Sequence, residues 1–322
     1  MTAHRSARLP VEGHLPAFDG ATTWLNSPPL TPGGLRGKVV LVNFWTYTCV
    51  NWLRQLPYVR EWSRRYAAAG LVVVGVHTPE FPFEHDQANV RREVAARGVG
   101  WPVPMDNDYA IWTAFANHYW PALYLADTEG RIRYHHFGEG EYGRTELVLQ
   151  ELLGSSSHHL VTVEASGAEV GADWGTLRSP ENYAGYARAE RFASPEGLDH
   201  DKPRRYSVPG RLGLNSWALD GDWTIGEQAT TLNSAAGGVA YRFHARDLNV
   251  VMGAATPVRF RVRLDGAPPG EAAGGDLDPD GHGTAADRRL YQLLRQPGRV
   301  ADRTAEITFL DPGAELYSFT FG

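Results

Sequence analysis

Cysteine is nearly missing from this 322-residue chain, in which Cys49 is the only thiol. A single cysteine excludes an intrachain disulfide, which fits a reducing compartment. Lysine is also scarce, since Lys38 and Lys202 are the only two. The formal net charge is -6. The chain therefore lacks the excess of positive charge that binding to nucleic acid or to an anionic membrane requires, and we predict neither partner.

Long apolar segments are lacking too. No stretch approaches the ~18 apolar residues that a membrane helix needs, and the charges near the N-terminus are not followed by the apolar region of a signal peptide. We therefore predict a cytoplasmic location. The composition, 43% hydrophobic and 21% charged residues, is that of a soluble globular protein long enough for two domains.

The first half of the chain alternates between strand-like and helix-like segments, which predicts an α/β domain over residues 1–154. Two β-branched apolar runs, at 38–45 and 71–78, predict buried parallel strands with a helix over 52–69 between them. The remaining expected elements are helices over 86–97, 108–119 and 145–153 and a β-hairpin over 121–137.

The pattern changes after the small polar residues at 154–159. We predict a linker over 155–174 and a second domain over 175–322, because short strands there are separated by Gly, Pro and Asp turns. Such spacing is typical of an all-β sandwich or jelly roll. One helix is expected within it, over 286–294.

Cys49 lies where an apolar run ends and a helix is expected to begin. Unpaired N–H groups and the positive end of the helix dipole favour a thiolate over a thiol at this place. Because the thiolate is the nucleophile, Cys49 is the candidate catalytic residue. Its neighbours Tyr47, Thr48 and Trp52 would form the wall around the sulfur and contact the substrate.

A strand GKVVLVNFW, a short loop, Cys49, a helix and Pro57 follow one another in an order that resembles the thioredoxin fold. The resemblance is to its redoxin branch, which includes the thiol-disulfide oxidoreductases of cytochrome c maturation and the peroxiredoxins. The segments NFWTYTC, GVHTPEF, DNDY, YWPA and HFGEG together resemble the periplasmic C-terminal part of DipZ-type proteins. Those proteins join a thioredoxin-like domain to a β-rich, carbohydrate-binding-module-like domain. The resemblance implies thiol-disulfide exchange in the first domain, with a protein disulfide or a small thiol as partner, and suggests a glycan as partner of the second.

The resemblance also implies roles for three further residues. Pro121 matches the family's cis-proline, whose loop faces the cysteine and offers backbone partners to a bound peptide, and Trp120 beside it is assigned to the same surface. Glu80 follows the strand at 71–78. It resembles the family's active-site acid, which would exchange a proton with the leaving thiol.

The second cysteine of the family's Cys-x-x-Cys motif is missing, because Trp52 occupies its position. An indole cannot attack a mixed disulfide, so the two-cysteine cycle is excluded. We predict a single-cysteine exchange that needs no cofactor and is resolved by an external thiol. Two alternatives stay open. One is a one-cysteine peroxidase, although Val42 and Pro121 replace that family's proline and arginine; the other is a binding module that keeps the fold as a scaffold.

An acidic segment in the second half, DLDPDGHGTAAD, has the spacing of a calcium loop. Asp276, Asp278, Asp280 and Asp287 stand at its positions 1, 3, 5 and 12, and Gly281 stands at position 6. The segment resembles an EF-hand or dockerin-type loop, with the helix expected over 286–294 after it. The sequence thus predicts a Ca²⁺ site in the second domain.

Five aromatic residues of the second half leave two interpretations open. They would line a sugar-stacking face, as the resemblance suggests, or fill the core of a sandwich. The residues are Tyr183, Tyr186, Trp217, Trp223 and Tyr241.

Overall fold

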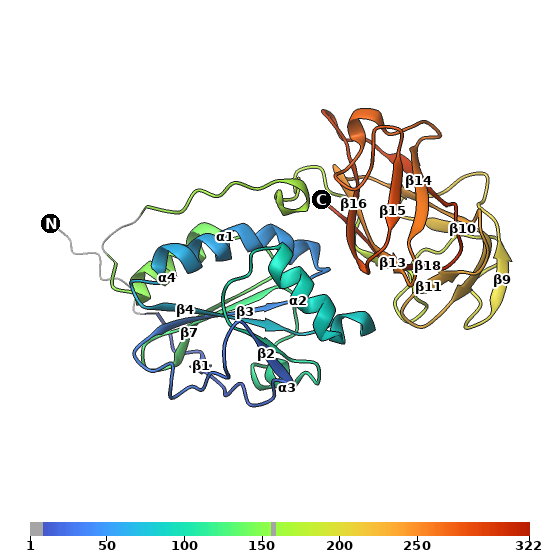
Figure 1. The fold of residues 1–322 in the computed structure, drawn as a ribbon. Helices are drawn as coiled ribbons and strands as arrows, with labels where there is room; N and C mark the ends of the chain where they lie inside the picture. Colours follow the sequence, from blue (N-terminus) through green and yellow to red (C-terminus); the bar gives the residue numbers. More distant parts are fainter. Residues whose placement is uncertain (1–8, 156–158) are drawn as a thin grey trace. The chain divides into compact units, whose positions relative to one another are not determined.

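The computed structural model describes residues 9–155 and 159–322. It divides into two compact units, the first ending at Glu169 and the second beginning at Val170 (Figure 1). This division falls inside the expected linker, whose limits at 155 and 174 stay a prediction. Within the described ranges, no helix is both long and apolar enough to cross a membrane.

The first domain is built on a seven-stranded sheet with the order β1-β7-β6-β3-β4-β5-β2. The central strand β3 pairs in parallel with β4 and antiparallel with β6. Its strands are β1 (Gly13–His14), β2 (Thr23–Leu25), β3 (Val39–Trp45), β4 (Leu71–His77), β5 (Val103–Met105), β6 (Ala122–Ala126) and β7 (Arg131–Phe137). The expected parallel strand pair and the hairpin β6–β7 are confirmed.

Helices pack on both faces of this sheet, so β3 is buried along its whole length. Because strand side chains alternate, Val40 and Phe44 join the core that includes Ile111, whereas Asn43 and Trp45 contact the helix that follows β3. The helices are α1 (Val50–Tyr66), α2 (Gln87–Ala96), α3 (Ala110–Ala114) and α4 (Tyr142–Leu152), with 3₁₀ turns at Pro82–His85 and Gly167–Glu169.

Helix α3 is shorter than the sequence predicts. The expectation of a helix over 108–119 is wrong before Ala110 and beyond Ala114, because Tyr109 before the helix and Ala116 after it adopt left-handed backbone angles, with φ of 58° and 49°. Its start is held by Asp106, whose carboxylate accepts the N–H groups of Ile111 and Trp112. The N-cap residue itself is Tyr109, and its side chain makes no capping hydrogen bond.

The second domain is almost entirely antiparallel β-sheet, as expected. Its eleven strands follow the path β15-β14-β17-β12-β10-β11-β18-β13-β16, with β8 paired to β18 and β9 to β10. The strands are β8 (Asn182–Tyr183), β9 (Pro203–Tyr206), β10 (Trp217–Ile225), β11 (Thr230–Leu232), β12 (Gly238–Phe243), β13 (Asp247–Ala254), β14 (Val258–Leu264), β15 (His282–Ala285), β16 (Arg289–Arg295), β17 (Arg303–Phe309) and β18 (Ala314–Phe321).

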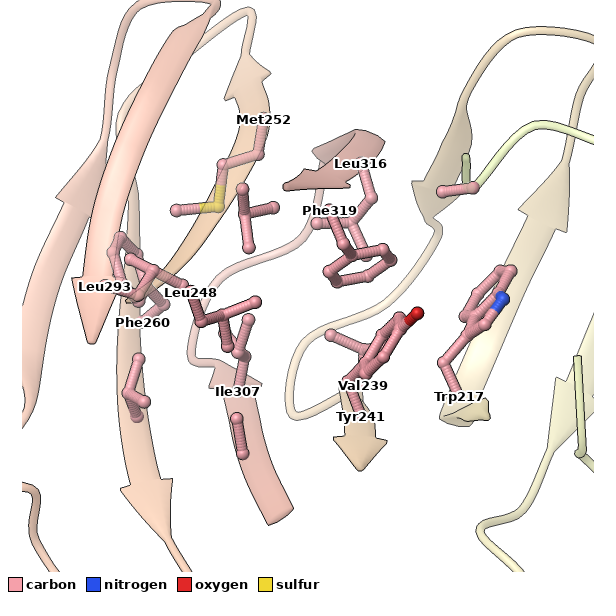
Figure 2. Close-up of a cluster of buried hydrophobic side chains, with 14 of the residues drawn as sticks. Trp217, Val239, Tyr241, Leu248, Met252, Phe260, Leu293, Ile307, Leu316 and Phe319 are labelled. Carbon is pink, nitrogen blue, oxygen red and sulfur yellow. The ribbon is translucent and has the colours of Figure 1, made fainter. Parts of the chain in front are cut away.

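Strand β10 pairs with different strands along its length and so links the two parts of the sheet. Its first residues pair with β12, and its last residues pair with β11 and β9. The enclosed core is apolar and rich in aromatic rings. Figure 2 shows Trp217, Tyr241 and Phe319 together in it, with the rings of Tyr241 and Phe319 4.9 Å apart.

The helix expected over 286–294 is wrong, because this segment contains the strand β16, which pairs antiparallel with β13. Its residues Leu290, Tyr291, Leu293 and Leu294 are buried, although β16 is the last strand of the sheet path. A short apolar run of this kind has no periodicity that separates a buried strand from a helix, so pairing with β13 decides its structure.

Candidate active site at the carboxyl ends of β3 and β4

Cys49 is the N-cap residue of α1, as expected, and its backbone is extended with φ -71° and ψ 111°. Its N–H donates to Thr46 O at 3.3 Å, and its carbonyl accepts the N–H of Leu53 at 3.0 Å. The thiol is half-buried. The first turn of this 17-residue helix carries no acidic side chain of its own, so no residue of α1 there offsets the positive end of the helix dipole. This placement favours the thiolate.

The peptide bond between Trp120 and Pro121 is cis, as the resemblance predicts. Pro121 comes directly before β6, whose Ala122 pairs with Phe44 of β3. The cis bond therefore lies at the same end of the sheet as the carboxyl end of β3, where the turn to Cys49 begins. Two hydrogen bonds join the end of β3, the residue after β4 and the loop that carries the cis bond. Thr78 N–H donates to Trp45 O at 3.0 Å, and Trp120 Nε1 donates to Thr78 O at 3.0 Å.

Trp52 exposes no surface to a substrate, which does not support the substrate contact expected from its position in the sequence. Its side chain is fully buried and stacks on Trp45 with ring centroids 4.2 Å apart. Its Nε1 donates to Asn43 Oδ1 at 3.0 Å, while Asn43 Nδ2 donates to Gln55 Oε1 at 2.7 Å. Trp52, at the position of the family's second cysteine, is thus held in the core by ring stacking and by a buried network of hydrogen bonds.

The side chains of Tyr47 and Thr48 are buried as well. Neither therefore offers the substrate-contacting surface that the sequence predicts. Tyr47 stacks on His77 with centroids 5.8 Å apart, and burial raises the pKa of its hydroxyl. Burial also lowers the pKa of His77 to about 3, which keeps the imidazole neutral near neutral pH. Of the expected substrate-binding residues, Trp120 alone is partly exposed.

A buried carboxylate that the sequence did not single out contacts the turn before Cys49. Glu80 is half-buried, whereas Glu84, four residues later, is fully buried. Glu84 Oε1 accepts the hydroxyl of Thr48 at 2.6 Å, and its Oε2 accepts the N–H of Glu80 at 2.6 Å. The only sequence signal was a Glu in the helical turn opened by Pro82, which predicts a cap but not its burial.

Two aspartates of the predicted calcium loop form hydrogen bonds with other residues of the second domain. Asp276 accepts Arg289 NH2 at 2.6 Å and the N–H of Gln292 at 2.7 Å, and Asp278 accepts the N–H of His282 at 2.8 Å. Across residues 9–155 and 159–322 there is no group of three or more His, Cys, Asp or Glu side chains placed to hold a metal. Calcium binding by Asp276, Asp278, Asp280 and Asp287 stays a prediction, and it requires Asp276 to leave Arg289.

Three of the five aromatic residues considered for a sugar-stacking face belong to the core. Trp217, Trp223 and Tyr241 are buried in it (Figure 2 shows the first and third). Tyr186 stacks on His200 with centroids 4.1 Å apart, and Arg188 covers the ring of Tyr183. Glycan binding by this domain stays a prediction.

Comparisons with known proteins agree with this architecture. A family model described as Redoxin matches residues 11–152, and one described as Thioredoxin like C-terminal domain matches residues 179–322. Thiol-disulfide oxidoreductase YkuV of Bacillus subtilis is 31% identical over 133 residues, which are 41% of this chain and 88% of YkuV.

Protein DipZ of Mycobacterium bovis is 34% identical over 321 residues, which are 98% of this chain and 44% of DipZ. The chain therefore spans less than half the length of that relative. A solution structure of a thioredoxin-like protein in the oxidized form is 29% identical and covers 44% of this chain and 95% of its own, with a TM-score of 0.41. With its first domain covering most of YkuV, the chain belongs to the thiol-disulfide oxidoreductase-like redoxin family, and its second half is a thioredoxin-like C-terminal domain.

Proposed function

We propose that this chain is a single-cysteine thiol-disulfide oxidoreductase. The observation that carries the proposal is the half-buried Cys49 at the N-cap of α1, beside the cis bond at Pro121, with buried Trp52 where a second thiol would stand. A nucleophilic sulfur is therefore positioned for exchange, but no second sulfur of the chain can complete the cycle.

The first step is attack of the Cys49 thiolate on one sulfur of a substrate disulfide. A new S–S bond joins Cys49 to the substrate, the substrate's own S–S bond breaks, and the electron pair leaves on its other sulfur, which takes up a proton. Cys49 is oxidised and the leaving sulfur is reduced. Glu80, half-buried near this turn, is the proposed donor of that proton.

The second step needs an external low-molecular-weight thiol. Its thiolate attacks the mixed disulfide, the bond to Cys49 breaks, and Cys49 returns to the thiolate form while the external sulfur remains bound to the substrate. Trp52 cannot take this role, because its indole has no nucleophilic sulfur and is held by Trp45 and Asn43.

Mass spectrometry of the intact chain mixed with a disulfide-containing peptide tests this proposal. We expect an adduct at Cys49 that persists until glutathione is added. If no adduct forms at neutral pH although iodoacetamide labels Cys49 after unfolding, the thiol is structural and the proposal fails. Reduction of hydrogen peroxide faster than adduct formation would favour the peroxidase instead.

A pair of variants separates the two steps. Trp52→Cys restores Cys-x-x-Cys, so it should release the peptide without glutathione and gain an intramolecular disulfide. Trp52→Phe is the matched control, because it also loses the bond to Asn43 but supplies no sulfur. Release of the peptide by both variants would contradict the assigned role of the missing thiol.

A further inference from the structure

Glu84 connects two segments that are far apart in the sequence and meet beside Cys49. Its Oε2 accepts the N–H groups of Glu80 and Phe81 at 2.6 and 2.9 Å. Its Oε1 accepts the hydroxyl of Thr48 at 2.6 Å and, at a longer 3.4 Å, the N–H of the same residue. Both oxygens of this fully buried side chain are thus used.

Capping of a helical turn explains only half of these bonds. Glu84 stands at the third position of the turn Pro82–His85, from which a Glu ordinarily reaches back to the N–H groups at the start of the turn. Thr48 does not belong to that turn. It lies 36 residues earlier and comes directly before Cys49. The bond to Thr48 therefore holds the turn that carries the thiol.

We propose that Glu84 is a positioning residue for Cys49, which fixes the turn before the thiol through Thr48 and, by its own ionisation, sets the pH range in which the thiolate forms. This inference rests on the function proposed above. An ionised carboxylate can accept all four hydrogen bonds, whereas a protonated one must also donate, so the bonds to Thr48 rearrange on protonation. The negative charge also opposes a second negative charge on the nearby sulfur.

The surroundings of Glu84 favour a titration near neutral pH. Burial raises its pKa to about 7, against the hydrogen bond from Thr48 that lowers it, and the charge of Glu80 raises it further. Burial moves the pKa of Tyr47 and of His77 away from neutrality, in opposite directions. The other charged or titratable groups of this neighbourhood come from the same turn and from α2: His85, Asp86, Arg92 and Glu93.

The pH dependence of Cys49 alkylation by iodoacetamide in the full chain tests this inference. We expect Glu84→Gln to lower the apparent midpoint by on the order of one pH unit, because it removes a negative charge beside the thiolate. Asp86→Asn is the matched control. It removes a carboxylate of the same segment whose side chain caps α2 by accepting the N–H groups of Ala88 and Asn89, and it should leave the midpoint within a fraction of that shift.

A second variant keeps the test decisive if Glu84→Gln does not fold. Thr48→Val keeps the shape of the side chain but removes the hydroxyl that stabilises ionised Glu84, so the midpoint should move in the same direction. A merely structural role would change the melting temperature and leave the midpoint in place. Coincident midpoints in wild type, Glu84→Gln and Thr48→Val would overturn the inference. Failure of the proposed function shows separately, as the absence of a peptide adduct.

Discussion

The two domains differ in what they bury. Among the described residues, the buried carboxylates, arginines and histidine of the first domain are Arg54, His77, Glu84, Glu93, Asp106, Asp127, Arg133 and Glu146. The second domain buries Asp247 alone of these types, and this carboxylate is paired with Arg295 and Arg246. Burial of a charged group costs free energy unless it is paired or hydrogen-bonded. The first domain offsets this cost repeatedly, as in the pairs of Arg54 with Glu139 and of Asp127 with Arg133, whereas the second domain does so for Asp247.

The location of this cost is informative. Thr48, His77 and Glu84 all lie at or just after the carboxyl ends of β3 and β4, where Cys49 begins α1. Groups with strongly shifted pKa values gather where chemistry takes place, although structural networks shift them too. In the second domain the inner faces of the strands form a large apolar cluster, which stabilises the domain. The comparison predicts that changes in the first domain affect the reaction and that changes in the second affect stability.

The largest effect on activity should come from Cys49→Ser. A hydroxyl at this place is not nucleophilic enough to open a disulfide, so the peptide adduct should vanish completely. Stability should change little, because Ser is a favourable N-cap residue for α1. Mass spectrometry and thermal melting of the same sample check both parts. Residual adduct in the variant would place the reaction at another group.

The next effect compares one buried tryptophan from each domain. Trp52→Ala and Trp217→Ala should each lower the free energy of unfolding by about 3–5 kcal/mol, because both rings are fully buried. Only Trp52→Ala should also slow adduct formation, since Trp52 lies in the helix that begins at Cys49. Denaturant unfolding and the adduct rate measure the two consequences. A slower adduct in Trp217→Ala would remove the distinction between the domains.

An intermediate effect concerns the pH dependence of stability in the first domain. Since burial raises the pKa of Glu84 to about 7 from its usual 4.5, the folded state holds this proton more tightly than the unfolded state. The stabilisation is therefore complete below about pH 4.5 and is lost as the pH rises through about 7. Between pH 5 and pH 8.5 the loss should be about 2–3 kcal/mol.

Glu84→Gln removes this titration. Relative to wild type, the variant should gain stability as the pH rises from 5 to 8.5, as measured by denaturant unfolding at each pH. Asp86→Asn, which removes a carboxylate at the N-cap of α2, serves again as the control. If wild type and Glu84→Gln lose stability in parallel over this range, another group titrates in place of Glu84.

Local signals made much of this molecule predictable from its sequence. The unbroken apolar run of β3 and the polar turn after it located Cys49 at the start of α1, and the family motif around Pro121 predicted the cis bond. These features depend on neighbouring residues. Strand β16 was mistaken for a helix because only its pairing with β13 distinguishes the two.

Local signals in the sequence do not show where a side chain points or which distant residues it contacts. Trp52 adjoins the thiol in sequence but points into the core, where Asn43 and Trp45 hold it. Glu84 meets Thr48 across 36 residues, and neither residue alone carries a sign of that contact. Glu80 follows the strand directly and resembles the family's active-site acid. A carboxylate one helical turn later is the buried one, and only the fold shows this.

Calcium should give the smallest effect, and it should be confined to the second domain. Binding by Asp276, Asp278, Asp280 and Asp287 must first separate Asp276 from Arg289, so the net affinity should be weak. At a Ca²⁺ concentration equal to a dissociation constant of about 1 mM, the gain is about 0.4 kcal/mol. Calorimetry with chelator and with Ca²⁺ should show a small upward shift of the melting temperature and an unchanged rate of Cys49 alkylation. Mg²⁺ is the control, because it demands tighter octahedral geometry than this loop offers. Equal melting temperatures with chelator and with excess Ca²⁺ would remove the calcium site, and the second domain would then be stabilised by its apolar core and its ion pairs without a metal.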